Sequence, residues 1–355
     1  MPPSGAVGGP ELFDPWESAA GFASVWVAHL GRRYGLLRAL DGLGRGAGPG
    51  EIARLTGLDR KAVGLWCEAA AELGLLKGRR GRYALKGDAR ALILDDRDHR
   101  YVGGLLSYLA LRSLDYHLFD ALFGRGSADS DGARHLTEAY AEATRWDHLA
   151  FFELVVPRVR GLRSVLERGA RALDIGCGTG GWAVELCLRY SAASAVGVDP
   201  DGAAISVARR RAEEAGLSDR LTFVEGTSES LEFGEEFDLV YLGEVLCVAS
   251  DRLGVLRSAR RALRRGGLLV VAEGLSERTG DSRQDALLRF IALDYALQGG
   301  SMLSRRELSS LLSRSGFGRA RFVHAGGGLW FAVAARHGRG NSDGKRRSGA
   351  SKPTG

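Results

Sequence analysis

The sequence predicts an α/β protein, with a mostly parallel seven-stranded sheet that ends in an antiparallel hairpin and follows a mainly α-helical domain. From residue 171 onward, short apolar runs alternate with helical segments, which indicates parallel strands joined by helices. Near the end, two apolar runs flank the three glycines of 326–328, which predicts the hairpin. Before residue 171, apolar residues recur mostly at helical spacing.

The first half of the chain carries the pattern of helices followed by one small hairpin. The expected elements are helices over 21–43, 51–55 and 60–73, strands over 75–77 and 82–85, and helical stretches over 100–123 and 133–158. Glycine-rich segments at 42–50 and 124–132 separate them. Helix, short helix, turn, helix and hairpin is the element order of a winged helix, so we expect a winged-helix domain here.

The second half of the chain supplies the sheet. Strands are expected over 172–175, 195–199, 221–224, 237–242, 268–272, 319–325 and 329–336, with helices over 181–190, 203–215, 251–263 and 304–315. The resulting domain plan is a disordered N-terminus over 1–15, a winged-helix front domain over 16–132, connecting helices over 133–170, a sheet domain over 171–336 and a disordered basic tail over 337–355.

Composition and cysteine use exclude several classes of protein. Hydrophobic residues make up 45% and charged residues 26% of the chain, as in ordinary globular proteins rather than collagen-like or disordered ones. No apolar run reaches the roughly 18 residues that span a bilayer, and the first residues do not match a secretion signal. The four cysteines form no C-x-x-C pair. We therefore expect reduced cysteines, no metal, no membrane association and a cytoplasmic location.

The net charge of +6 is concentrated in the tail. Six basic residues and one acidic residue lie in 336–355, so the rest of the chain is nearly neutral. A winged-helix DNA-binding regulator stays open as an alternative, because the predicted hairpin carries basic residues between 77 and 82. The helix that would read a DNA groove offers Leu65, Glu68 and Glu72 where cations and base-directed donors are needed. We therefore expect no nucleic-acid partner.

A glycine-rich loop after the first strand of the sheet is the most informative motif. Gly176, Gly178 and Gly181 match G-x-G-x-x-G, in which glycines let the backbone turn tightly beside a ligand at a helix N-terminus. The same loop serves dinucleotides, but Asp174 lies two residues before the first glycine and would repel a pyrophosphate. The same charge attracts the cationic end of an amino-acid-bearing cofactor. A glycine turn without a ligand is the structural alternative.

A second acidic residue closes the next strand. Asp199 lies 23 residues after Gly176, at the carboxyl end of the neighbouring strand, where a carboxylate can accept both ribose hydroxyls. The structural alternative is a cap on the helix that follows. Together with the glycine loop, Asp199 indicates a ligand that contains a nucleoside.

These motifs resemble those of the class I S-adenosylmethionine-dependent methyltransferases over roughly 171–336. Segments 223–228, 237–246 and 263–269 extend the resemblance in the same order and at similar intervals. The resemblance implies a Rossmann-like sheet, S-adenosyl-L-methionine as cofactor, and methyl transfer as the activity.

The resemblance also implies a set of cofactor contacts. These residues are Asp174, Gly176, Cys177, Gly178, Thr179, Gly180, Asp199, Pro200, Gly226, Thr227, Ser228, Gly243 and Glu244. In this set, Asp174 and the glycine loop would hold the methionine part, Asp199 would bind the ribose and Pro200 would lie against adenine. Related proteins commonly carry an aspartate where this chain has Thr227, so the adenine contact is altered.

The front domain resembles that of small-molecule O-methyltransferases, on segments 63–70, 73–76 and 82–85. The resemblance implies a small-molecule methyl acceptor and a homodimer formed through this domain. Plant-type members place a histidine base soon after the fourth strand, where this chain has Cys247, which we interpret as a pocket-lining residue. Carbon, nitrogen, sulfur or already ionised oxygen acceptors therefore stay open. His148, in the helix that enters the sheet domain, is the candidate base.

The sequence thus predicts an S-adenosylmethionine-dependent methyltransferase that acts on a small molecule. Besides a DNA-binding regulator, two alternatives stay open. One is a nicotinamide-dependent enzyme, because the glycine loop also serves dinucleotides. The other is a protein that binds S-adenosylmethionine without catalytic turnover.

Overall fold

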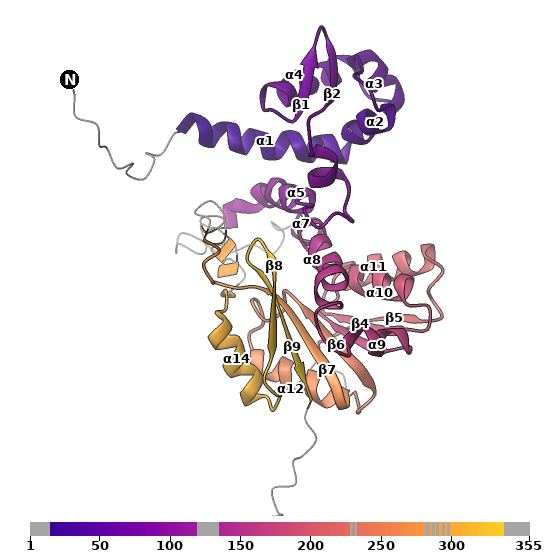
Figure 1. Ribbon diagram of the computed structural model, residues 1–355, viewed down its shortest axis with the longest axis vertical. Helices are drawn as coiled ribbons and strands as arrows, with labels where there is room; N and C mark the ends of the chain where they lie inside the picture. Colours follow the sequence, from indigo (N-terminus) through magenta and orange to yellow (C-terminus); the bar gives the residue numbers. More distant parts are fainter. Residues whose placement is uncertain are drawn as a thin grey trace, which may run out of the picture. The chain divides into compact units, whose positions relative to one another are not determined.

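The computed structural model describes residues 15–118, 135–227, 230, 233–280, 285, 288, 291–292, 295–296 and 299–336. Two compact units divide the chain, Met1–Leu149 and Ala150–Gly355 (Figure 1). The boundary between them lies inside the segment 133–170 that the sequence analysis predicts as a connection. The predicted disordered ends, 1–15 and 337–355, lie outside the described residues, except that Pro15 begins a helix.

The first unit begins with helices and a hairpin. Its first elements are α1 (Pro15–Arg33), α2 (Leu36–Leu43), α3 (Pro49–Thr56), α4 (Arg60–Glu72), β1 (Leu76–Arg79) and β2 (Arg82–Leu85). Gly35 has a left-handed φ of 69° and separates α1 from α2, so the single helix predicted over 21–43 is wrong. Ala47 pairs antiparallel with Tyr83, which ties the connection between α2 and α3 to the hairpin.

An apolar core joins these first helices. Each of α2, α3 and α4 buries one face, because apolar residues recur along it at helical spacing. Fully buried members of this core are Leu37, Ile52, Val63, Cys67 and Ala70. The first unit therefore has a hydrophobic core of its own.

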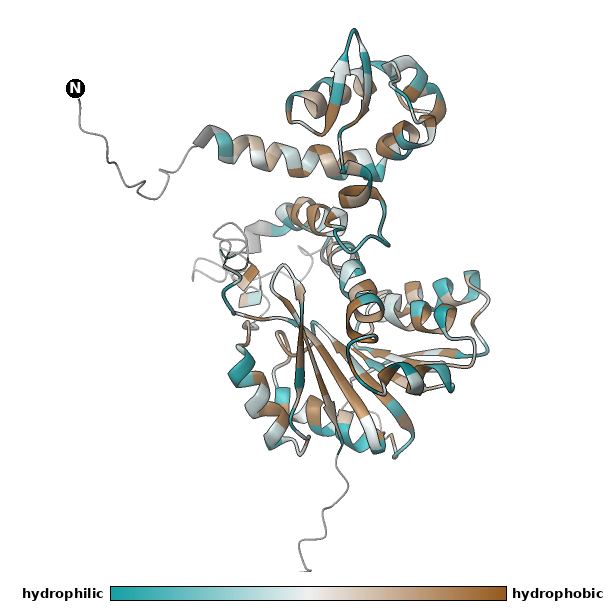
Figure 2. Cartoon of the chain, in the orientation of Figure 1, coloured by the Kyte–Doolittle hydropathy of each residue, from teal (hydrophilic) through white to brown (hydrophobic). Residues whose placement is uncertain are grey.

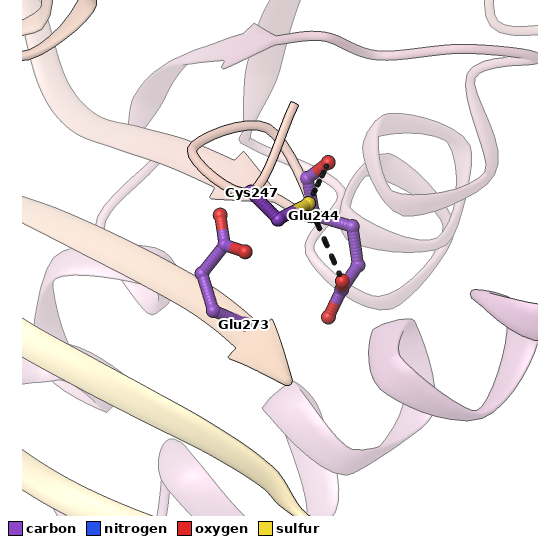
Figure 3. A group of neighbouring side chains, drawn as sticks. All are labelled: Glu244, Cys247 and Glu273. Atoms are coloured by element: carbon purple, nitrogen blue, oxygen red, sulfur yellow. Dashed lines mark hydrogen bonds between the residues drawn. The ribbon is translucent and has the colours of Figure 1, made fainter. Parts of the chain in front are cut away.

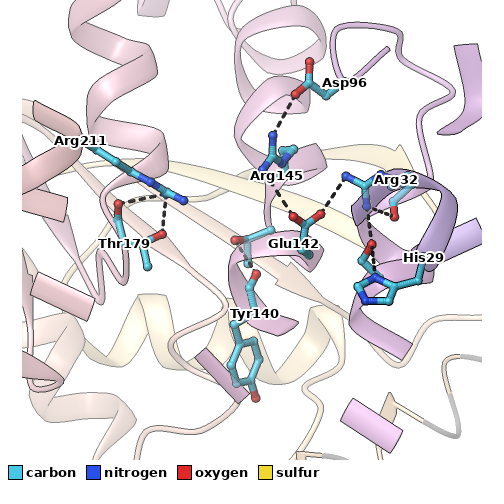
Figure 4. A network of polar contacts seen from close by, with 11 residues as sticks. His29, Arg32, Asp96, Tyr140, Glu142, Arg145, Thr179 and Arg211 are labelled. Carbon is cyan, nitrogen blue, oxygen red and sulfur yellow. Dashed lines mark hydrogen bonds and ion pairs between the residues drawn. The ribbon is translucent and has the colours of Figure 1, made fainter. Parts of the chain in front are cut away.

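The remaining helices of the first unit are held partly by charged side chains. They are η1 (Arg90–Leu94), α5 (Gly103–Arg112), η2 (Ser113–Leu118), α7 (Leu136–Ala143) and α8 (Arg145–Ala150). Arg32 on α1 pairs with Glu142 on α7 at 2.9 Å, and Arg145 on α8 donates to Asp96 at 3.1 Å (Figure 4). These contacts link α1 to α7, and α8 to the segment that follows η1.

The second unit contains the sheet. Its helices are η4 (Phe151–Val155), α9 (Leu162–Glu167), α10 (Gly181–Arg189), α11 (Gly202–Glu214), α12 (Arg252–Ala262) and α14 (Arg305–Arg314). Its strands are β3 (Arg171–Ile175), β4 (Ser194–Asp199), β5 (Leu221–Glu225), β6 (Phe237–Gly243), β7 (Leu263–Gly274), β8 (Arg321–Gly326) and β9 (Leu329–Ala335).

The strand order is β5-β4-β3-β6-β7-β9-β8. All pairs from β5 to β7 are parallel, and β9 pairs antiparallel with both β7 and β8. The predicted Rossmann-like fold, a mostly parallel seven-stranded sheet with an antiparallel C-terminal hairpin, is confirmed.

The middle of the sheet is apolar, as expected for parallel strands that are covered on both faces. Leu173 of β3 and Val240 and Leu242 of β6 are fully buried, and hydrophobic colour follows the strands in Figure 2. Trp182 stacks on Tyr241 with ring centroids 4.3 Å apart, which packs α10 against β6. Among the helices that the structure describes, none combines the length and apolar character needed to cross a membrane.

Candidate functional site

The carboxyl ends of β3, β4 and β6 define the candidate site. β3 pairs with β4 on one side and with β6 on the other, so the strand order reverses at β3. In open α/β sheets, ligands bind in the crevice at such a switch point. The loop after β3 and the ends of β4 and β6 meet here, and they carry most of the residues singled out in the sequence.

Three glycines shape the loop after β3. Gly176, Gly178 and Gly180 have φ values of 72°, 51° and 77°, all in the left-handed region that favours glycine. A Cβ at Gly176 would lie 2.4 Å from Cγ2 of Val245, and one at Gly180 would lie 2.7 Å from Cζ of Phe223. A Cβ at Gly178 would meet nothing within 4 Å. The first and third glycines are thus required by packing as well, whereas the backbone of Gly178 borders open space.

Asp199 is joined to this loop by a hydrogen bond. Its Oδ2 accepts the N–H of Gly178 at 2.8 Å, and its Oδ1 accepts the N–H of Asp201 at 2.9 Å. Helix α11 is capped by Asp201, which accepts the N–H of Ala203 at 2.8 Å, so Asp199 is not the cap. Each oxygen of Asp199 can accept a further hydrogen bond. Pro200, the predicted neighbour of adenine, follows Asp199 directly and is exposed.

Asp174 places a carboxyl group inside the sheet. Its side chain is 2% exposed, and burial, followed by the negative charge of Asp199, raises its pKa well above the usual range. No ion pair to Asp174 is present among the described residues. A nearby positive charge on a ligand would favour the ionised form. Cys177 is also buried, and burial followed by the charge of Asp174 raises the pKa of its thiol, so it lines the loop as a neutral group.

Helix α11 fixes the outer part of the loop. Arg211 donates from Nη1 to Oγ1 of Thr179 at 2.6 Å and to its carbonyl oxygen at 3.2 Å (Figure 4). The hydroxyl of Thr179 is therefore engaged by a guanidinium group. The bond stabilises the loop in the conformation that the glycines permit.

The end of β5 lies beside Asp199. The N–H of Gly226 donates to the carbonyl oxygen of Asp199 at 3.0 Å. Thr227 is exposed, and its Oγ1 accepts the N–H of Ser230 at 3.2 Å. Ser228, the next predicted contact, lies outside the described residues.

A group of acidic and neutral side chains occupies the ends of β6 and β7. We call Glu244, Cys247, Glu273 and Tyr295 the carboxyl cluster. One ligand atom from each of Glu244, Cys247 and Glu273 lies within 4.8 Å of the others (Figure 3). This spacing suits a bound cation or a pair of carboxyl groups that carries one proton in total. Both oxygens of Glu244 already accept hydrogen bonds, from the N–H of Gly274 at 2.7 Å and from the hydroxyl of Tyr295, which favours the singly protonated pair.

The structure describes three further residues that the sequence singled out, Gly243, Cys247 and His148. Gly243 ends β6 beside Tyr241, since a Cβ there would lie 2.9 Å from Cε1 of that ring. Burial, followed by the charges of Glu273 and Glu244, raises the pKa of the Cys247 thiol, so it cannot replace a histidine base. His148 lies on α8 in the first unit, and its role as a base stays a prediction.

Glu273 and the contact between Tyr295 and Glu244 were not predicted from the sequence. An acidic residue that directly follows the apolar run 268–272, at the carboxyl end of a parallel strand, is the signal that could have identified Glu273. Tyr295 is far from Glu244 in the sequence and carries no comparable signal.

Comparisons with known proteins find methyltransferases. Residues 172–267 match a family model described as a methyltransferase domain. A sterol 24-C-methyltransferase of Aspergillus fumigatus is 38% identical over 111 residues, which cover 31% of this chain and 29% of that protein. A ubiquinone biosynthesis O-methyltransferase of Azorhizobium caulinodans is 40% identical over 114 residues, which cover 32% of this chain and 43% of that protein. The chain thus spans less than half the length of either relative.

Solved structures match over most of the chain. Human N-acetylserotonin methyltransferase, in complex with S-adenosylmethionine, has a TM-score of 0.65 at 20% identity and covers 93% of this chain and 100% of its own. The pyocyanin biosynthetic protein PhzM has a TM-score of 0.64 at 20% identity and covers 90% and 97%. At this identity the likeness establishes the fold, including a helical region before the sheet.

Proposed function

We propose that the chain is an S-adenosylmethionine-dependent methyltransferase that acts on a small molecule. The observation that carries this proposal is the hydrogen bond between Asp199 and Gly178, beside the buried Asp174. This bond joins a carboxylate suited to ribose hydroxyls to an open glycine backbone at the switch point of the sheet, and the buried carboxyl group of Asp174 lies near the end of β3, the strand that leads into this loop. The methyltransferase family match covers the same segment.

The residues present suit this cofactor. Bound there, S-adenosylmethionine would supply a methyl group on a positively charged sulfur. The carboxyl group of Asp174 would lie near the cationic methionine part, and the free lone pairs of Asp199 would accept the ribose hydroxyls. The backbone of Gly178 leaves room for close approach. A nicotinamide dinucleotide suits the site less well, because its pyrophosphate would face Asp174.

We propose that the first unit is a winged helix that serves dimerisation rather than DNA binding. Its α4 would be the reading helix, and Leu65, which is 60% exposed, lies on that helix with the exposed Glu68. Such a face is poorly suited to phosphates and bases. Leu55 is 59% exposed and Phe22 is 56% exposed, so the same unit offers apolar surface for a second copy of the chain.

We also place the protein in the cytoplasm. Its four cysteines, Cys67, Cys177, Cys187 and Cys247, are buried and free, which suits a reducing compartment.

The test of the proposed function is a calorimetric titration of the full chain with S-adenosylhomocysteine, followed by a scan of small molecules for incorporation of labelled methyl groups. We expect saturable binding and label in at least one acceptor. Binding of NADH with no response to S-adenosylmethionine or S-adenosylhomocysteine would contradict the proposal. Binding without label in any acceptor would favour the silent binding protein.

A further inference from the structure

The carboxyl cluster stands where the expected histidine base is missing. Glu244 follows β6, Cys247 lies three residues later, and Glu273 lies near the end of the neighbouring strand β7. The segment after β6 packs directly against the glycine loop, because a Cβ at Gly176 would lie 2.4 Å from Cγ2 of Val245. The cluster therefore borders the site proposed for the methyl donor.

Glu244 is held in an unusual backbone conformation. Its φ is 55°, which side chains with a Cβ rarely adopt, and its N–H donates to the carbonyl oxygen of Ala272 at 2.9 Å. Its carboxylate accepts the N–H of Gly274 at 2.7 Å and the hydroxyl of Tyr295. Glu244 as a whole residue is partly exposed, and a carboxylate oxygen can accept more than one hydrogen bond. Backbone outliers of this kind are concentrated at functional sites.

Glu273 is a buried carboxyl group with an unused oxygen. The side chain is 1% exposed, its Oε1 accepts the N–H of Leu246 at 2.6 Å, and its Oε2 has no hydrogen-bond partner among the described residues. Figure 3 shows the carboxyl group of Glu273 pointing toward Cys247 and Glu244. A buried oxygen without a partner is costly, so it indicates a proton or ligand at this position.

Within the part of the chain that the structure describes, no positively charged side chain pairs with either carboxyl group. Cys247 and Tyr295 are the described titratable side chains that contact them, and burial raises the pKa of both, so both stay neutral. Arg252 of α12 approaches the same loop but donates to the carbonyl oxygens of Leu246 and Ser301. Across the sheet from Glu273 lies Trp330 of β9, which carries no charge.

Two neighbouring carboxyl groups in such surroundings do not both ionise readily. Burial raises the pKa of Glu244, and burial followed by the charge of Glu244 raises that of Glu273. A cation that arrives nearby reverses this preference, because it stabilises the doubly ionised pair. Under the proposed function, the methyl donor is such a cation and its product is not.

We propose that Glu244 and Glu273 together carry one proton in the free protein, release it when the cationic methyl donor binds, and then accept the proton of a neutral hydroxyl acceptor through Glu244. This inference rests on the proposed function. The acceptor oxygen forms a bond to the methyl carbon while the carbon–sulfur bond breaks and its electron pair stays on sulfur. The O–H bond breaks, and the proton goes to the carboxylate of Glu244. Glu273 and Tyr295 act as positioning residues.

The charge of the pair also selects the acceptor. Two carboxylates repel an acceptor that is already ionised, so the acceptor arrives with its proton and loses it on the protein. We assign the proton to Glu244 because Glu244 is partly exposed as a whole residue, whereas Glu273 is 1% exposed. The ionised oxygen acceptor left open by the sequence is therefore disfavoured.

The test is calorimetric titration of the full chain near neutral pH, with S-adenosylmethionine and with S-adenosylhomocysteine, in phosphate and in Tris. Comparing the binding heats in the two buffers gives the number of protons released with each ligand. The two ligands differ in the methyl group and the sulfonium charge, so the difference in proton release between them reports on the carboxyl pair. We expect release of about one proton more with S-adenosylmethionine. In Glu273→Gln only the carboxyl group of Glu244 remains, and it is already ionised without the donor. The difference in proton release between the two ligands should therefore disappear. The matched control, Glu213→Gln on the exposed face of α11, keeps it.

Equal proton release with both ligands, or a difference that persists in Glu273→Gln, would overturn this inference alone. Failure of both ligands to bind would overturn the proposed function and this inference with it. With an acceptor from the methylation scan, Glu244→Gln should lower turnover at least about 100-fold while binding of S-adenosylhomocysteine is kept. Unchanged turnover in Glu244→Gln would remove it as the base.

Discussion

Replacing Asp199 with alanine removes the carboxylate that joins β4 to the glycine loop. The N–H groups of Gly178 and Asp201 lose their acceptors, and a bound nucleoside loses the partner of its ribose hydroxyls. A hydrogen bond to a charged group contributes about 1.5–3 kcal/mol. Since about 1.4 kcal/mol is a tenfold change in affinity, loss of one such bond raises the Kd for S-adenosylhomocysteine about tenfold to a hundredfold.

The matched control is Asp201→Ala, two residues away. Asp201 caps α11 through the N–H groups of Ala203 and Ala204, so its loss should cost about 0.5–2 kcal/mol of folding stability. Its carboxylate is not the group predicted to touch the ligand, so affinity should change little. Asp199→Ala should show the opposite pattern, with weaker ligand binding and little change in folding stability. This substitution removes a negative charge that raises the pKa of the buried Asp174, and the resulting gain in folding stability offsets part of the loss from the broken hydrogen bonds.

The assay is calorimetric titration with S-adenosylhomocysteine, combined with thermal unfolding of each variant. The prediction separates the two neighbours, with weak binding in Asp199→Ala and a lowered Tm in Asp201→Ala. If Asp199→Ala binds as tightly as the natural chain, or if Asp201→Ala loses affinity to the same extent, the assignment of Asp199 to the ribose is wrong.

Three further predictions follow from the packing and the buried charges. Gly104→Ala should destabilise the first unit by about 1–3 kcal/mol in denaturant unfolding, because the added Cβ would lie 1.9 Å from a backbone oxygen of α7. The control is Gly42→Ala, whose Cβ would meet nothing within 4 Å and which should leave stability unchanged or raise it. Asp174→Asn should raise the Tm near neutral pH and weaken cofactor binding. Burial raises the pKa of this carboxyl in the folded protein, so its presence destabilises the fold increasingly as the pH rises from the ordinary aspartate pKa toward the raised one. The gain from Asp174→Asn should therefore vanish in acid below the ordinary pKa, where an unchanged difference would contradict the reasoning. Tyr295→Phe removes a donor to Glu244 and so raises the pKa of Glu244, which should move the acidic limb of the rate profile to higher pH. A shift to lower pH would count against the proposed base.

The sheet was predictable because each parallel strand is a short apolar run bounded by turn residues. Strands β3 and β6 are buried on both faces of the sheet, so their apolar runs could be recognised without knowledge of their neighbours. The helices of the first unit were less predictable. A single left-handed residue, Gly35, divides the helix expected over 21–43, and an isolated glycine inside an apolar repeat gives no decisive signal.

The candidate site likewise contains residues that the sequence could predict and residues that it could not. Asp174 and the glycines lie within one local motif, and Asp199 follows at a spacing fixed by one strand–helix–strand unit, so the sequence could indicate that they meet. The carboxyl cluster depends on contacts that no local pattern encodes. Glu273 reaches Glu244 through the pairing of β6 with β7, and Tyr295 reaches it from a later helical segment. Their meeting is a product of tertiary structure.

The most direct test is a crystal structure of the full chain with S-adenosylhomocysteine. We expect the ligand at the carboxyl ends of β3 and β4, with its ribose on Asp199, its amino-acid part beside Asp174 and its sulfur toward Glu244. A crystal grown with saturating ligand in which this loop is filled by the protein's own side chains, or in which the ligand lies elsewhere, would contradict this expectation.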